Sequence, residues 1–177
     1  MYGYEDKTYN EVLTQAVNNI EEINQAVDAI CEKGYKNLYL VGTGGTYAMA
    51  SPLSYLIKTN STSFVVAVLT EDSVSELGNV DRPTIVMDQW MYHSRLYAAA
   101  KYAKEVGATV IVLVGEKECP LTEYADYVFE NRTASNDNLV EEIYIQYFAL
   151  GARFMKNNGE FPEYEKFIDA LKQMPEV

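Results

Sequence analysis

The sequence predicts an α/β fold in which one parallel sheet of five strands is covered by helices on both faces. Two observations favour this fold. Short apolar segments rich in β-branched residues alternate with longer segments of helical periodicity along the 177 residues, as in a parallel sheet buried between helices. In addition, the first apolar segment, residues 37–41, ends in a glycine-rich turn directly before a helical pattern, as a strand does before a crossover helix.

The N-terminal segment is predicted to be one helix over residues 8–32. Thr8 and Glu11 have the spacing of a capping box, in which each side chain caps the backbone of the other residue. Apolar residues then recur at helical spacing, and Gly34 is placed to end the helix. The strand at 37–41 follows, and after the turn a second helix is predicted to extend to about residue 58.

The rest of the chain repeats the alternation of strand and helix. Further strands are predicted at residues 64–69, 83–87, 108–114 and 126–129. Helical segments are predicted at residues 70–77, 93–106, 121–124, 139–156 and 162–173. Because the sequence contains no internal repeat and no linker, we expect a single domain over residues 1–177. It would comprise an N-terminal helix to about 34, an α/β core over 35–157 and a C-terminal helix over 158–177.

The charge and hydropathy of the chain exclude several classes of partner. The 14 basic and 26 acidic side chains give a net charge of -12. Such a charge repels phosphate backbones and anionic lipid, so we expect neither nucleic acid nor a membrane surface as partner. The sequence has no apolar run long enough to span a membrane, and its N-terminus lacks the basic and apolar regions of a signal peptide. We therefore expect a cytoplasmic protein.

The residues that usually bind metals are too few and too scattered to form a metal site. Cys31 and Cys119 lie far apart in the sequence and are accompanied by one histidine, His93. This set gives neither a disulfide framework nor a zinc site. We therefore expect no metal and no cofactor.

The glycine turn, residues 42–46, is the candidate ligand-binding segment. It consists of Gly42, Thr43, Gly44, Gly45 and Thr46. Glycine allows a backbone to approach a ligand closely, and the helix that follows has unpaired N–H groups at its start, so the turn is suited to an anion such as a phosphate. It matches neither the dinucleotide-binding fingerprint nor the P-loop. A turn that binds nothing is the alternative.

The other loops expected near this turn follow from the fold. In open parallel sheets, ligands bind beyond the carboxyl ends of the strands, near the point where the strand order reverses. The loops at that edge are predicted at residues 42–46, 69–74, 88–93 and 115–120.

Several stretches resemble the SIS (sugar isomerase) domain family. Residues 40–48 are similar to the first loop of these domains, and residues 107–113, with the Cys-Pro-Leu of 119–121 and the Ala-Asp of 125–126, to their fourth and fifth strands. Residues 138–144 and 161–164, with the Met-Pro of 174–175, resemble one branch, the fructosamine-6-phosphate deglycases.

The resemblance implies a fold, a ligand class and a site. The fold would be a flavodoxin-like, three-layer α/β/α sandwich with a five-stranded parallel sheet, used as a dimer or as two tandem copies. The ligand would be a phosphorylated sugar, held by hydroxyl groups and loop N–H groups. Residues Gly44, Gly45 and Thr46 match the first loop of the family, with Thr46 at its hydroxyl position.

The second ligand loop of the family is not matched here. After its third strand the family has a Ser-x-Ser-Gly-x-Thr-x-Glu pattern, whereas residues 88–97 contain no glycine and few hydroxyl groups. Asp88 would repel a phosphate, and Trp90, Met91 and Tyr92 are bulky where a ligand needs small residues. The loop after the second strand also differs from the family. The two changes suggest one remodelled surface, of natural or engineered origin.

Two functions from different classes therefore stay open. The first is a phosphosugar-binding domain that lacks turnover alone, because the chain resembles only the first of the two halves of a deglycase. The second is a remodelled or engineered protein-binding or assembly module on an SIS scaffold. Its contact patch would comprise Trp90, Met91, Tyr92, His93 and Tyr97, because Trp, Tyr and Met are enriched in interfaces and His93 and Tyr97 share a helix face.

Two further expectations concern the helix at 139–156. Glu141 and Glu142 lie at its start, where acidic side chains favour the helix dipole. Capping of the helix is their alternative to a catalytic role, for which Glu141 is the candidate base. The helix is also apolar nearly all round, whereas one sheet face covers a single stripe of it. A homodimer is therefore expected, unless the first helix supplies the missing cover within the chain.

Overall fold

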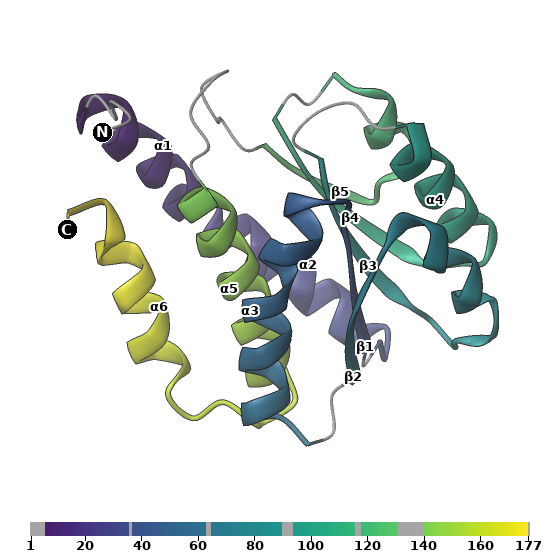
Figure 1. The fold of residues 1–177 in the computed structure, drawn as a ribbon. Helices are drawn as coiled ribbons and strands as arrows, with labels where there is room; N and C mark the ends of the chain where they lie inside the picture. Colours follow the sequence, from purple (N-terminus) through teal and green to yellow (C-terminus); the bar gives the residue numbers. More distant parts are fainter. Residues whose placement is uncertain are drawn as a thin grey trace.

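The sheet of the computed structural model contains five parallel strands and lies between two layers of helices (Figure 1). The structure describes residues 6–35, 37–62, 65–89, 94–115, 118–130 and 140–176. The strands are β1 (Asn37–Val41), β2 (Val65–Leu69), β3 (Thr84–Gln89), β4 (Thr109–Val114) and β5 (Tyr127–Glu130). Their spatial order is β2-β1-β3-β4-β5, so the strand order reverses between β1 and β3, with Leu40 paired to both Val68 and Val86.

Successive residues of each strand alternate between two separate hydrophobic cores, because side chains of a strand point to opposite faces. Leu38 and Leu40 join the core under α1 (Asp6–Asn18), α2 (Ile20–Glu32), α3 (Gly45–Asn60), α5 (Val140–Asn157) and α6 (Tyr164–Gln173). Tyr39 and Val41 join the core under α4 (Ser94–Glu105) and the 3₁₀ helices η1 (Glu71–Asn79) and η2 (Pro120–Tyr124). A last 3₁₀ turn, η3 (Met174–Glu176), ends the described chain.

The predicted fold class is confirmed, and the element boundaries differ in several places. Helix α1 begins at Asp6, so Thr8 lies inside it and is not its cap residue. The segment expected as one helix is divided at Asn19, whose side chain donates a hydrogen bond to the Glu130 carbonyl at 3.2 Å. Asparagine is a weak helix former, and this contact holds it against the end of β5. The segment 70–77 is a 3₁₀ helix that reaches Asn79, and β3 extends through Asp88 to Gln89, which we expected in a loop.

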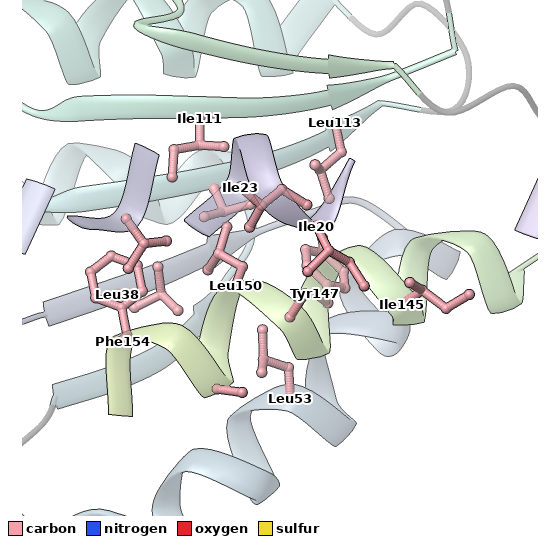
Figure 2. Packing of buried hydrophobic residues seen from close by; sticks show 14 of the residues in the cluster. Ile20, Ile23, Leu38, Leu53, Ile111, Leu113, Ile145, Tyr147, Leu150 and Phe154 are labelled. Carbon is pink, nitrogen blue, oxygen red and sulfur yellow. The ribbon is translucent and has the colours of Figure 1, made fainter. Parts of the chain in front are cut away.

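Other helices of the same chain cover α5, so the apolar surface of α5 is no longer a reason to expect a dimer. Helices α1, α2, α3 and α6 all contact α5, and Ile145, Tyr147 and Phe154 are fully buried (Figure 2). Phe148 packs edge-on against Phe167 of α6, with 6.2 Å between ring centroids. A charged residue at Ile145 would therefore be buried at a high cost. The homodimer stays a prediction without support from α5.

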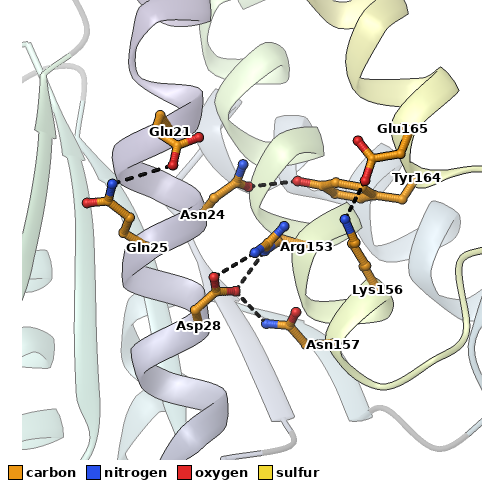
Figure 3. A network of polar contacts seen from close by, with 9 residues as sticks. All are labelled: Glu21, Asn24, Gln25, Asp28, Arg153, Lys156, Asn157, Tyr164 and Glu165. Carbon is orange, nitrogen blue, oxygen red and sulfur yellow. Dashed lines mark hydrogen bonds and ion pairs between the residues drawn. The ribbon is translucent and has the colours of Figure 1, made fainter.

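A network of hydrogen bonds and ion pairs joins α5 and α6 to α2 (Figure 3). Arg153 donates two hydrogen bonds to the Asp28 carboxylate, at 2.7 and 2.6 Å, and Asn157 donates another at 2.8 Å. On α6, the Tyr164 hydroxyl donates to the Asn24 side chain at 3.0 Å, and the Lys156 ammonium lies 4.1 Å from the centroid of the Tyr164 ring. Fork-shaped pairing of this kind fixes the geometry of two helices as well as their contact.

The Asp28 contact predicts a pH-dependent contribution to stability. The pKa of Asp28 is lowered below 3.8, mainly by the hydrogen bonds from Arg153. A carboxylate with a lowered pKa stabilises the fold above its unfolded pKa and loses that effect as the pH falls through its folded pKa. Asp28→Asn should therefore lower the free energy of unfolding near neutral pH, and the difference from the original chain should shrink below pH 3.8.

Urea unfolding between neutral and acidic pH measures this difference. Asp169→Asn, at an exposed position of α6, controls for the loss of one surface charge. A stability difference for Asp28→Asn that stays constant down to the acid-unfolding limit would contradict the assignment.

Candidate functional site

The glycine turn lies at the carboxyl edge of the sheet, where the strand order reverses. It joins the end of β1 to the start of α3, and β1 is one of the two strands between which the order changes. This is the position at which parallel α/β sheets bind ligands. The Gly42 N–H continues the pairing of β1 by donating to the Leu69 carbonyl at 3.2 Å, so the turn begins directly at the sheet edge.

Two glycines give the turn its shape. A Cβ atom at Gly42 would lie 2.6 Å from both the Thr46 carbonyl carbon and the Tyr47 nitrogen, so no other residue fits without displacing the start of α3. Gly44 has φ 55° and ψ -116°, a backbone conformation that is accessible almost only to glycine. The sequence therefore needs glycine at these two positions to pass from β1 into α3.

The Thr46 hydroxyl closes the turn from within. Thr46 is buried, its Oγ1 accepts a hydrogen bond from the Thr43 N–H at 2.9 Å, and the same hydroxyl donates to the Thr43 carbonyl at 3.0 Å. We predicted Thr46 as the hydroxyl that binds a ligand. In this structure the hydroxyl holds the backbone of the turn, and the role in ligand binding stays a prediction.

The face of the turn around Gly44 and Gly45 is open. A Cβ atom at either residue would meet no heavy atom within 4 Å. At the start of α3, the Thr46 N–H donates to Thr43 and the Ala48 N–H to Gly44. The N–H groups of Gly45 and Tyr47 have no such acceptor among the described residues. Unpaired N–H groups beside open space at a helix start are the usual donors to an anion.

An acidic residue lies beside this open face. Glu71, the first residue of η1, is nearly buried, and its carboxylate accepts a hydrogen bond from the Thr43 hydroxyl at 2.9 Å. Arg95, near the start of α4, lies 4.0 Å from the same carboxylate and 3.5 Å from Asp72. Three segments that are distant in the sequence thus meet at the turn. The sequence predicts the loop at 69–74, which contains Glu71, at this edge of the sheet, but it singles out neither Glu71 nor Arg95 as a site residue.

Tyr97 is placed away from this cluster, between α4 and η2. Its hydroxyl lies 3.1 Å from the Tyr124 hydroxyl and donates to Glu123 at 3.2 Å, and the two tyrosine rings pack edge-on. The hydrogen bond with Tyr124 is the main cause that raises the pKa of Tyr97 to about 12. The other members of the predicted contact patch, residues 90–93, lie outside the described residues.

Glu141 lies in the first turn of α5 and is partly buried. Its Oε2 atom is enclosed and has no hydrogen-bond partner among the described residues. The neighbouring Glu142 is fully buried. Two acids at a helix start suit the helix dipole, and no hydrogen bond in the described part of the chain joins Glu141 to the glycine turn.

The described residues hold no group of three or more His, Cys, Asp or Glu side chains placed to bind a metal ion. Within the same ranges, none of the helices combines the length and the apolar character needed to cross a membrane.

Open parallel sheets with a glycine-rich turn at the switch point form a broad class, and sequence comparison identifies the family within it. Residues 33–156 match the SIS domain family. Because this match covers well over half of the chain, the protein belongs to the SIS domain family. Comparison with curated protein sequences finds no match.

Solved structures with the same fold come from several kinds of protein. A candidate phosphosugar isomerase from Salmonella typhimurium LT2 has a TM-score of 0.78 and 20% identity over 89% of this chain and 49% of its own. The C-terminal domain of glucosamine-fructose-6-phosphate aminotransferase from Francisella tularensis has a TM-score of 0.76 and 11% identity over 99% of this chain and 55% of its own. This chain thus spans about half the length of these relatives.

A third structure is close to this chain in length. The sugar isomerase domain of an RpiR transcription factor from Sphaerobacter thermophilus has a TM-score of 0.69 and 22% identity. The match covers 93% of this chain and 95% of that domain. At these identities the three likenesses show a common fold.

The geometry of the turn predicts opposite results for alanine at two glycines. Gly42→Ala should destabilise the protein by about 1–3 kcal/mol, because its methyl group overlaps backbone atoms of α3. Gly45→Ala should be neutral or stabilising by up to about 1 kcal/mol, because its methyl group enters open space at a helix start. Urea unfolding of the two variants measures both changes. Equal losses of stability would show that the turn is not shaped as described.

Proposed function

We propose that this chain binds the phosphate group of a phosphorylated sugar at the glycine turn. The single observation that carries the proposal is the pairing of open space at Gly44 and Gly45 with unpaired N–H groups at the start of α3. Membership of the SIS domain family, whose related structures include candidate phosphosugar isomerases, supports a sugar as the rest of the ligand.

We propose further that the isolated chain binds such a ligand without converting it. The chain spans about half the length of the candidate isomerase from Salmonella typhimurium LT2, but 91% of a candidate phosphosugar isomerase from Bacteroides fragilis and nearly the whole sugar isomerase domain of a transcription factor. The proposal that the chain does not convert its ligand therefore rests on the resemblance to one branch of the family. The resemblance to fructosamine-6-phosphate deglycases implies an enzyme made of two such halves. Glu141, with one enclosed carboxylate oxygen, is the residue to test as a base if the chain does convert a phosphosugar.

The alternative function, a protein-binding module, has no observation among the described residues in its favour. Four of its five patch residues lie outside them, and the fifth, Tyr97, uses its hydroxyl and ring in the contact with Tyr124. The homodimer and the cytoplasmic location that the sequence predicts also remain proposals.

A charged substitution at Gly45 tests the proposed site. Gly45→Asp should abolish the binding of glucose 6-phosphate, because the new carboxylate fills the open space and occupies the N–H groups at the start of α3. The fold should be retained, since an acidic residue at a helix start is favourable. Ser51→Asp, at an exposed position of the same helix, adds an equal charge elsewhere and should bind almost normally.

Isothermal titration calorimetry measures the binding, with glucose as the control for the phosphate group. We expect heat with glucose 6-phosphate or fructosamine 6-phosphate and none with glucose. Absence of binding by the original chain would contradict the proposal, as would unchanged binding by Gly45→Asp. Turnover of either phosphosugar by the isolated chain would contradict the absence of catalysis.

A further inference from the structure

Arg95 is a cationic side chain held near the glycine turn by weak contacts. About two thirds of its side chain is exposed (65%), and its Nη1 atom lies 4.0 Å from a Glu71 oxygen and 3.5 Å from an Asp72 oxygen. Both distances exceed those of a hydrogen bond between charged groups. Asp72 is itself 73% exposed. Exposed ion pairs of this kind contribute little to stability, so the guanidinium can leave them at small cost.

Glu71, in contrast, is fixed beside the turn. Only 6% of its side chain is exposed, and its Oε1 atom accepts the hydrogen bond from the Thr43 hydroxyl at 2.9 Å. The same oxygen is the one that faces Arg95. The Thr43 hydroxyl and the guanidinium therefore contact the same carboxylate oxygen, and these two groups lie no farther apart than the sum of the two contacts. A phosphate group that accepts hydrogen bonds of about 2.8 Å is large enough to contact both groups.

The fixed carboxylate creates an electrostatic requirement for any anion bound at the turn. A phosphate on the N–H groups of α3 would lie near the negative charge of Glu71, which repels it. The N–H groups carry only partial charges, and the chain as a whole carries a net charge of -12. A full positive charge beside the turn offsets this repulsion, and a guanidinium is the group that binds phosphate oxygens most specifically.

We propose that Arg95 is the cationic residue of the phosphate site, and that Asp72 competes with the ligand for its guanidinium. In the ligand-free chain Arg95 faces Glu71 and Asp72. When a phosphate binds, the guanidinium turns from Asp72 to the phosphate and donates hydrogen bonds to its oxygens. This inference rests on the proposed phosphosugar site and adds to it a binding residue and an internal competitor.

Two substitutions should change affinity in opposite directions. Arg95→Gln should weaken the binding of glucose 6-phosphate and of inorganic phosphate by about tenfold or more, because a charge-assisted contact is lost. Asp72→Asn should tighten the binding of both by about two- to fivefold, because the guanidinium no longer has to leave an ion pair. If the ion pair served only to position the loops, both substitutions would weaken binding.

Matched controls separate these effects from a general change in charge. Arg82→Gln removes an arginine from the opposite edge of the sheet, where Arg82 donates to the Lys33 carbonyl at 2.8 Å. Glu76→Gln removes an exposed acid from the same 3₁₀ helix as Asp72. Arg82→Gln should change affinity less than Arg95→Gln does, and Glu76→Gln less than Asp72→Asn does. In the double variant of Arg95→Gln with Asp72→Asn, the tightening caused by Asp72→Asn should disappear.

Calorimetric titration measures the affinity of each variant, and circular dichroism checks that the variant is folded. Normal binding by Arg95→Gln, with binding still abolished by Gly45→Asp, would overturn the role of Arg95 and leave the phosphosugar site standing. Tightening by Asp72→Asn that persists without Arg95 would overturn the competition. If the original chain binds neither ligand, the proposed function fails, and the inference fails with it.

Discussion

The contact between Gly42 and the first turn of α3 is the constraint on which the site depends. The backbone of β1 passes so close to Thr46 and Tyr47 that a Cβ atom at Gly42 would overlap them. This closeness aims the start of α3 at the edge of the sheet where the strand order reverses. The hydrogen bonds between Thr43 and Thr46 hold the turn in that shape, and the open face at Gly44 and Gly45 follows from it.

The turn places hydrogen-bond donors, which would attract an anion, beside a buried acidic side chain, which would repel it. Glu71 holds the Thr43 hydroxyl and lies beside the N–H groups of α3. The local charge balance therefore depends on a nearby cationic side chain, the role that we propose for Arg95. In the proposed site, the backbone sets where a phosphate can lie, and the neighbouring charges decide how tightly it is held.

The sequence predicted what local pattern determines and missed what depends on packing. The positions of the five strands and the turn at Gly42 follow from apolar periodicity and from glycine chemistry, and the structure confirms them. The single helix predicted over residues 8–32 is wrong, because the structure divides it at Asn19. The meeting of Glu71 with Arg95 depends on how η1 and α4 pack against each other, which no local pattern encodes. The cover of α5 is a similar case, because it comes largely from α1 and α2, which are distant in the sequence, and the sequence left such cover open as the alternative to a dimer.

The most direct test of the account is an amide spectrum of the chain during titration with glucose 6-phosphate. The central claim is that N–H groups at the start of α3 hold the phosphate. A ¹⁵N–¹H correlation experiment reports each of these groups separately. The largest amide shifts should occur at Gly45 and Tyr47, and inorganic phosphate should produce the same pattern. Shifts centred on another part of the chain, or none at saturating ligand, would contradict the central claim.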